Sequence, residues 1–230
     1  GIISLALQAL AQGDVPLGII PAGTGNDHAR EFGIPRDDPE AAADIVATGR
    51  TRTIDLGHID GADGTVRWFG TVMSAGFDSL VTDRANRMTW PRGRMRYNAA
   101  MLVELSQLRM LPCRVSFDGG PETEMPMTLA TFGNGRSYGG GMLICPNADH
   151  GDGLLDITMV RTASRTKLIR LFPTVFKGTH VDLDTVSTRR ARTVAVECPG
   201  INAYADGDFA CALPVEISAV PAALKIRCPA

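Results

Sequence analysis

Residues 16–27 read PLGIIPAGTGND, which joins a short apolar segment to a glycine-rich loop and the start of a helix. The apolar residues 16–20 predict a strand buried on both faces, as in a parallel sheet. Residues 21–26 form the predicted loop, and residues 27–32 open a second helix. Apolar positions within residues 2–12 predict a helix before the strand. Helix, buried strand, loop and helix in this order are typical of an α/β domain.

The predicted secondary structure changes from helical to β-rich at Thr53. From there, short segments rich in β-branched residues are separated by Gly, Asp or Pro, and they predict a largely antiparallel sandwich or barrel. Residues 95–110 and 165–177 predict the two helices that interrupt these strands. The predicted fold class is therefore α/β plus mainly β. Residues 1–55 would be the end of an α/β domain, and residues 56–230 a β-rich sandwich domain.

Composition limits the classes of function. The chain has 230 residues, 44% of them hydrophobic, and a net charge of -2, so nothing in its bulk charge draws it to nucleic acid. No apolar run reaches the ~18 residues that a membrane span needs. The five cysteines are scattered and lack CxxC spacing. They predict free thiols in a reducing cytosol rather than a disulfide framework or a zinc site.

The loop at residues 21–26 has the composition of a phosphate-binding turn. Gly23 and Gly25 allow the backbone to approach a ligand closely, and Thr24 adds a hydroxyl donor. Backbone N–H groups at the following helix start can bind phosphate oxygens. Asn26 or Asp27 could instead cap that helix, and a capped glycine-rich turn needs no ligand. The local chemistry is compatible with both interpretations.

Two acidic turns lie further along the chain. Asp149 and Asp152 stand beside Gly151 and Gly153, and their hard oxygen atoms suit Mg²⁺ or Ca²⁺. A plain turn before the strand at residues 154–160 is the alternative, because Asp-Gly is a common turn dipeptide. The second turn, residues 205–208, reads ADGD. It suits either a carboxylate that accepts a proton or a hairpin turn with two exposed acids.

The stretch PLGIIPAGTGNDHAREFGIP closely resembles the second nucleotide-loop motif of the diacylglycerol kinase family, which includes bacterial lipid kinases and, more distantly, sphingosine and ceramide kinases. Where the family typically has Phe after GTGND, this chain has His28. Further motifs resemble the family's in the expected order. They are SAGFD at 74–78, FGNG at 132–135 with GGG at 139–141, CPNADHGDGLLD at 145–156, KGTH at 177–180 and DGD at 206–208.

The resemblance implies an α/β nucleotide domain and a β-sandwich domain with the active site between them, and a last segment that packs back on the first domain. It implies transfer of the γ-phosphoryl group of ATP to a lipid hydroxyl, most simply diacylglycerol, which would enter an apolar cleft of the β-rich domain. A cytoplasmic enzyme, peripheral at the inner membrane surface and with homodimerisation as an option, is expected. A kinase for a sphingoid base or other lipid alcohol, and a non-catalytic lipid-binding module, are the alternatives.

The same resemblance assigns roles to individual residues. The nucleotide loop would use Gly23, Thr24, Gly25, Asn26 and Asp27. The carboxylate of Asp152 and the carbonyls of Asp149 and Leu154 would bind Mg²⁺. Asp208 stands where the family usually has Glu and would be the proton acceptor, while Asp206 would organise the metal network.

Gly1 resembles the last glycine of the family's GGDGT loop, whose aspartate is not in this sequence. We therefore expect several tens of further residues upstream. On that basis residues 1–230 alone would be inactive and would bind ATP poorly.

Arginines and large apolar residues alternate in residues 84–97, among them Trp90. This segment could meet lipid headgroups with Trp90 at the interface. A solvated helix end with its loop is the alternative. The amphipathic residues 167–177 predict a helix that packs on the core rather than on a membrane.

Overall fold

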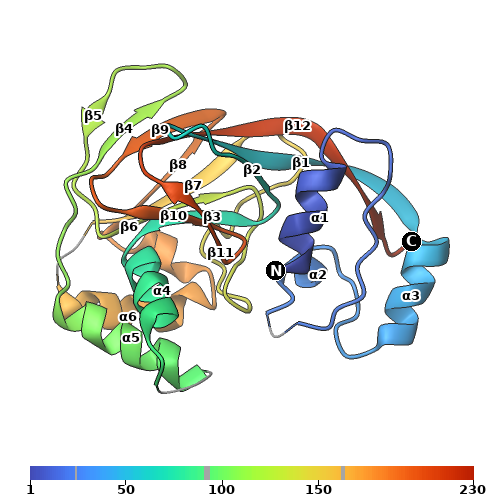
Figure 1. The fold of residues 1–230 in the computed structure, drawn as a ribbon, viewed down its shortest axis with the longest axis horizontal. Helices are drawn as coiled ribbons and strands as arrows, with labels where there is room; N and C mark the ends of the chain where they lie inside the picture. The colour runs from blue at the N-terminus through green and yellow to red at the C-terminus, as the bar shows by residue number, and fades with distance from the viewer. Residues whose placement is uncertain (24, 91–93, 162–163) are drawn as a thin grey trace.

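The computed structural model describes residues 1–23, 25–90, 94–161 and 164–230, without the side chains of residues 94, 97 and 98. Two six-stranded antiparallel sheets dominate it (Figure 1). The first sheet has the order β2 (Val66–Phe69), β1 (Arg50–Gly61), β12 (Val215–Cys228), β9 (Thr193–Glu197), β4 (Arg114–Phe117) and β5 (Thr123–Glu124). The second has the order β11 (Asp208–Ala212), β10 (Asn202–Ala205), β3 (Val72–Gly76), β6 (Leu129–Gly133), β7 (Leu155–Val160) and β8 (Val186–Ala191).

The main core lies between the two sheets. Alternate residues of each strand point inward, as the pleat requires, and bury large side chains such as Phe69, Phe132, Ile157 and Ile217. The predicted sandwich of largely antiparallel strands is therefore confirmed.

Three helices form a layer over the second sheet: α4 (Phe77–Arg87), α5 (Arg94–Ser106) and α6 (Arg165–Val175). A short 3-10 helix, η1 (Thr179–Asp182), follows α6. Leu168, Leu171 and Val175 of α6 pack on Val72 and Val160 of the sheet. The helices predicted at residues 95–110 and 165–177 are thus present with slightly different bounds.

The N-terminal part contains α1 (Ile2–Leu10), α2 (Asp27–Glu31) and α3 (Pro39–Thr48). The side chain of Asp38 caps α3 by accepting a hydrogen bond from Ala41 N at 2.9 Å. A second core joins this part to the far ends of β1 and β12, where Leu7 and Phe32 pack with Ile54 and Ile226. The two long strands therefore run from the sandwich into the N-terminal part (Figure 1).

The strand predicted at residues 16–20 is wrong in its burial and in its pairing. Among the described residues, the segment makes an isolated parallel bridge between Leu17 and Ile226 of β12. Leu17 and Ile19 are buried, whereas Ile20 is 53% exposed. A run of apolar letters does not reveal how many neighbouring strands a segment has, and here one edge meets β12 while alternate side chains face outward.

The prediction that all cysteines are free thiols is also wrong, because Cys113 and Cys198 form a disulfide with Cα atoms 4.3 Å apart. They flank the paired residues Arg114 and Glu197 of β4 and β9, so antiparallel pairing places them opposite each other. The 85-residue separation between them hides this pairing in the sequence. Cys145, Cys211 and Cys228 are buried free thiols.

Candidate active site

The loop before α2 is held by its own side chain. Asn26 adopts left-handed backbone angles, and its amide accepts from Gly23 N at 3.0 Å and donates to Gly23 O at 2.9 Å. A Cβ atom built on Gly23 would lie 3.0 Å from Asn26 Oδ1, so the tight loop favours glycine there. Asn26 therefore closes the loop instead of capping α2 with its side chain. Thr24 lies outside the described residues.

Asp27 joins this loop to the glycine-rich segment 139–141. One carboxylate oxygen accepts from Gly140 N at 2.8 Å, and the other pairs with Arg30 Nη1 at 2.7 Å. A Cβ atom on Gly25 would lie 3.2 Å from Asp27 Oδ2 and 3.7 Å from Gly140 N. The two glycine-rich motifs, 113 residues apart in sequence, thus share one carboxylate.

The end of α2 contacts two further motifs. Glu31 accepts from Arg136 Nε at 2.8 Å, and its carboxylate lies 3.8 Å from His150 Nδ1. The ring of Phe32 packs on that of His150 with centroids 4.9 Å apart. Burial lowers the pKa of His150, although the Glu31 carboxylate opposes the shift. The neutral ring fills space between the motifs.

The acidic motif at residues 205–208 is the turn of the β10–β11 hairpin. Asp206 has a φ of 51° and a side chain only 4% exposed. Its carboxylate accepts from Gly70 N at 2.8 Å, Thr71 N at 2.8 Å and Thr71 Oγ1 at 2.6 Å. His28 Nε2 lies 3.6 Å from the same carboxylate. Residues 205–208 therefore form a hairpin turn, but the exposure of both acids that the hairpin alternative implied is wrong for Asp206.

Asp208 has a different environment in the same turn. Its side chain is 39% exposed and contacts the amino group of Gly1. Hydrogen bonds to Gly70 and Thr71 thus tie Asp206 to the residues before β3, while Asp208 stays partly exposed.

The predicted metal segment forms a glycine-containing turn. Asp149 Oδ1 accepts from Gly151 N at 3.0 Å, and Asp152 Oδ1 accepts from Leu154 N at 3.0 Å. The other oxygen of Asp152 pairs with Arg190. The described residues contain no group of three or more His, Cys, Asp or Glu side chains that could hold a metal. A cation here would depend on main-chain carbonyls in addition to Asp152.

Asp156 follows this turn on β7 and pairs with Arg190 Nε at 3.1 Å. Burial, together with the charge of Asp149, raises the pKa of Asp156 to about 6. Asp156 thus shares the Arg190 guanidinium with Asp152.

Asp55 of β1 was not expected from the sequence, yet it orders the metal segment. Its buried carboxylate accepts from Gly153 N at 2.7 Å and from Ala222 N at 2.9 Å. Its backbone N–H donates to His150 O at 2.7 Å. An Asp between the apolar Ile54 and Leu56 was the available signal, because a buried charge needs hydrogen-bond donors.

Asp78 is a second residue that the site adds. It lies in the first turn of α4, accepts from Ser79 N at 2.9 Å and is partly buried. Burial raises the pKa of Asp78 to about 6, against opposing hydrogen bonds from Ser74, Ser79 and Tyr138. Tyr138 directly precedes the glycine-rich segment, so Asp78 approaches that segment from α4.

Replacing Asp78 with Asn is expected to flatten the pH dependence of stability. The folded-state pKa of about 6 exceeds the ordinary value of 3.8, so the carboxyl stabilises the fold fully below about pH 4 and loses this effect as pH rises through 6. The variant should be more stable than the parent at pH 7.5, by up to about 3 kcal/mol, and little changed at pH 4. Urea unfolding at both pH values measures this, with exposed Asp37→Asn as control. If the unfolding free energies of Asp78→Asn and the parent differ by the same amount at pH 4 and at pH 7.5, the prediction is refuted.

A small cavity lies where α4 and α5 cover the sheet. It is lined by Phe77, Leu80, Leu108 and Leu111 and has a volume of about 10 Å³. That is room for about one water molecule. None of the helices in the described part of the chain combines the length and the apolar character that crossing a bilayer requires.

Comparison with known proteins agrees with this arrangement. Residues 1–59 match a family model described as the diacylglycerol kinase catalytic domain, and residues 71–228 match one described as the YegS C-terminal NAD kinase beta sandwich-like domain. A protein of Mycobacterium tuberculosis named diacylglycerol kinase is 70% identical over 229 residues, covering 100% of this chain and 74% of that protein. A probable lipid kinase YegS-like protein of Stenotrophomonas maltophilia is 31% identical, with 97% and 72% covered.

Solved structures show the same fold. A putative diacylglycerol kinase from Bacillus anthracis superposes with a TM-score of 0.71 at 22% identity, covering 92% of this chain and 68% of that one. Yeast NADH kinase gives a TM-score of 0.54 at 10% identity, with 99% and 60% covered. Two matched domain models and a relative of 70% identity agree with the motifs that meet around α2. The chain belongs to the diacylglycerol kinase family of lipid kinases.

Proposed function

We propose that the protein transfers the γ-phosphoryl group of ATP to the free hydroxyl of diacylglycerol and so forms phosphatidic acid. The observation that carries the proposal is the convergence of three separate motifs on the five-residue helix α2. Asp27 contacts the glycine-rich segment, His28 approaches Asp206, and Glu31 contacts Arg136 and lies near His150.

The nucleotide would bind at the loop of residues 23–27. The contact of Gly25 with Gly140 leaves backbone without side chains on both sides of the loop, where phosphate oxygens can approach N–H groups. Asn26 and Asp27 hold this loop in shape through Gly23 and Gly140. Thr24 would add its hydroxyl. In this proposal residues 1–55 contribute the nucleotide side of the site and residues 56–230 the lipid side.

Asp208 would accept the proton of the lipid hydroxyl as that oxygen attacks the γ-phosphorus of ATP. The bond from this phosphorus to the bridging oxygen breaks, and ADP leaves. Phosphoryl transfer needs a positioned acceptor and neutralised charge more than covalent help. Asp208 is partly exposed and lies against Gly1, the position that resembles the last glycine of the GGDGT loop. Asp206 would position it through the rigid turn.

The segment 149–154 would hold Mg²⁺, since its carboxylate and carbonyl oxygens are the hard ligands this ion takes. Asp152 would contribute its side chain, while Asp149 and Leu154 would contribute carbonyls. When bound, Mg²⁺ supplies positive charge that orders the acidic turn. Arg190, which contacts Asp152 and Asp156, would keep this turn attached to β8.

Replacing Asp152 with Ala should weaken Mg²⁺ binding and lower activity together, by about tenfold or more in each. Calorimetric titration of Mg²⁺ without nucleotide provides a readout independent of turnover. The matched control is Asp184→Ala, an exposed acid outside the turn. If Asp152→Ala binds Mg²⁺ and turns over like the parent, the proposed metal site does not lie in this segment.

The direct test of function is to incubate the full-length protein with labelled ATP and a panel of lipids. Diacylglycerol, a sphingoid base and other lipid alcohols are offered separately. Labelled phosphatidic acid is the expected product. If another lipid alcohol is labelled in preference, that alcohol and not diacylglycerol is the substrate. ATP binding without transfer to any lipid would favour a non-catalytic module.

A further inference from the structure

The end of α4 together with α5 and α6 differs in charge from the rest of the chain. Residues 84–110 and 161–177 together hold 11 of the 23 basic residues but only one of the 25 acidic ones. That acid, Glu104, is buried and paired with Arg84 at 2.5 Å. Because the whole chain has a net charge of -2, the remaining residues are net acidic and the molecule is strongly polarised.

The same layer exposes large apolar side chains. Helix α6 carries an inward stripe of Leu168, Leu171 and Val175 that packs on the sheet. A second stripe, Ile169, Phe172 and Phe176, is 57%, 44% and 47% exposed. The rings of Phe172 and Phe176 contact each other edge to face with centroids 5.6 Å apart. The predicted core packing of this helix therefore accounts for one of its two apolar stripes.

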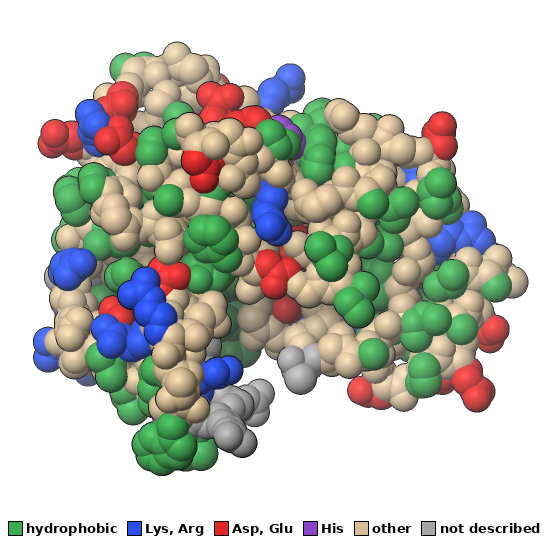
Figure 2. All heavy atoms as spheres, in the orientation of Figure 1, with side chains coloured by type: hydrophobic (Ala, Val, Ile, Leu, Met, Phe, Trp, Pro, Cys, Tyr) green, Lys and Arg blue, Asp and Glu red, His purple; other side chains and the backbone are tan. Residues whose placement is uncertain are grey.

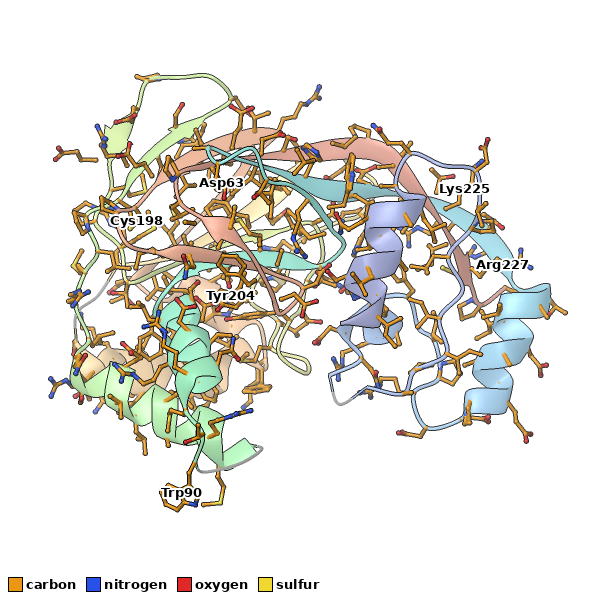
Figure 3. The ribbon with its side chains drawn as sticks, viewed as in Figure 1. Asp63, Trp90, Cys198, Tyr204, Lys225 and Arg227 are labelled. Atoms are coloured by element: carbon orange, nitrogen blue, oxygen red, sulfur yellow. A yellow bond between two sulfur atoms is a disulfide. The ribbon has the colours of Figure 1, made fainter. Side chains whose placement is uncertain are left out.

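The segment before α5 adds a projecting aromatic ring. Trp90 is 81% exposed and points away from the body of the molecule at the end of the helical layer (Figure 3). Met95 and Leu102 of α5 are 69% and 68% exposed. Figure 2 shows Lys and Arg side chains beside hydrophobic ones over the helical layer.

The two helices present one outer side. Leu105 and Leu108, at and just beyond the end of α5, pack in the same cluster as the inward stripe of α6. Arg165, at the start of α6, donates to Ser106 O at the end of α5. Both helices thus cover the same sheet, and the exposed residues of each lie away from that packing. We call Trp90, Met95, Leu102, Ile169, Phe172 and Phe176, with the exposed Lys167, Arg170 and Lys177, the basic-apolar face.

We propose that the basic-apolar face docks the protein on the surface of an anionic membrane. Exposed Trp and Phe favour the boundary between headgroups and acyl chains, while Lys and Arg attract anionic lipid. A second copy of this chain would present the same positive charge, which disfavours pairing through this face. The inference deepens the proposed function, on which it rests, because it states how a lipid kinase reaches a substrate within a bilayer.

Sedimentation with vesicles tests the docking without reference to catalysis. The full-length protein should bind phosphatidylglycerol vesicles and bind phosphatidylcholine vesicles at least about tenfold more weakly. Phe172→Ser/Phe176→Ser and Lys167→Glu/Arg170→Glu should each weaken binding to the anionic vesicles by about tenfold or more. The matched controls Val66→Ser and Arg50→Glu change exposed residues of β2 and β1 and should bind like the parent.

Fluorescence locates the contact. Trp68 and Trp90 are the two tryptophans of the chain, so a Trp68→Phe background leaves Trp90 as the reporter. Its emission should shift to shorter wavelength on anionic vesicles alone. Parent-like vesicle binding by both double variants, or an unshifted emission, would overturn the proposal. A dimer in solution that Phe172→Ser/Phe176→Ser abolishes would overturn it in favour of a second copy.

A soluble substrate separates this inference from the proposed function. The double variants should phosphorylate monomeric short-chain diacylglycerol like the parent while losing activity on diacylglycerol in vesicles. If the parent phosphorylates the soluble substrate but does not bind anionic vesicles, the docking proposal fails and the function stands. If it binds the vesicles but phosphorylates neither substrate, the function fails and the docking surface stands.

Discussion

Asp208→Asn is expected to lower kcat for lipid phosphorylation by about 10²–10⁴-fold, because the amide preserves size but cannot accept the proton. Asp208 is partly exposed at the end of a rigid hairpin, so the exchange should leave the fold intact. Steady-state kinetics with short-chain diacylglycerol measures kcat, and nucleotide titration measures the affinity for ATP. The affinity should change little, since the proposed role concerns the acceptor hydroxyl.

Asp208→Glu is the informative companion, because Glu is the residue that the family usually has at this position. It should retain much of the parent's activity and restore the pH dependence that the Asn variant lacks. Parent-like turnover of Asp208→Asn would mean that another group accepts the proton. An equally inactive Asp208→Glu would indicate that the geometry of the turn, rather than basicity, is limiting.

Asp206→Asn is expected to lower the free energy of unfolding by about 2–4 kcal/mol. The Asp206 carboxylate accepts three hydrogen bonds from Gly70 and Thr71, and an amide would turn one acceptor into a donor that faces another donor. Asn tolerates the left-handed backbone at this position, so the effect isolates the lost acceptor. Urea unfolding of the parent and the variant gives the difference.

Asp208→Asn serves as the matched control for this prediction, since it makes the same change two residues away in the same turn. Its unfolding free energy should stay within about 0.5 kcal/mol of the parent. A parent-like stability of Asp206→Asn would contradict the assignment of Asp206 as the residue that fixes the hairpin to β3.

The sandwich could be predicted because its strands are short, rich in β-branched residues and separated by turn residues, and α6 could be predicted because its apolar residues recur at helical spacing. Helix α4 was missed, since its sequence FDSLVTDRANR has few apolar residues. Tertiary packing decides it: Val81 and Ala85 meet Ala100 of α5. The apolar run 16–20 was overestimated for the opposite reason, because hydrophobicity alone does not count neighbouring strands.

The motifs of the site were identified from sequence, but their mutual contacts were not. The bond from Gly140 N to Asp27 joins residues 113 apart, and no periodicity encodes such a pairing. The different environments of Asp206 and Asp208 depend on where Gly70 and Thr71 lie in three dimensions. Asp55 was overlooked because its donors, Gly153 and Ala222, come from distant turns.

The central claim is that Asp208 serves a lipid phosphoryl transfer in a site assembled around α2. The most direct measurement is mass spectrometry of lipid products formed by the parent and Asp208→Asn from diacylglycerol and ATP labelled with heavy oxygen in its γ-phosphoryl group. The account predicts that the parent yields phosphatidic acid carrying the labelled phosphoryl oxygens on the original lipid oxygen, and that Asp208→Asn yields almost none. Unlabelled product, no product from the parent, or equal labelling by both proteins would contradict it.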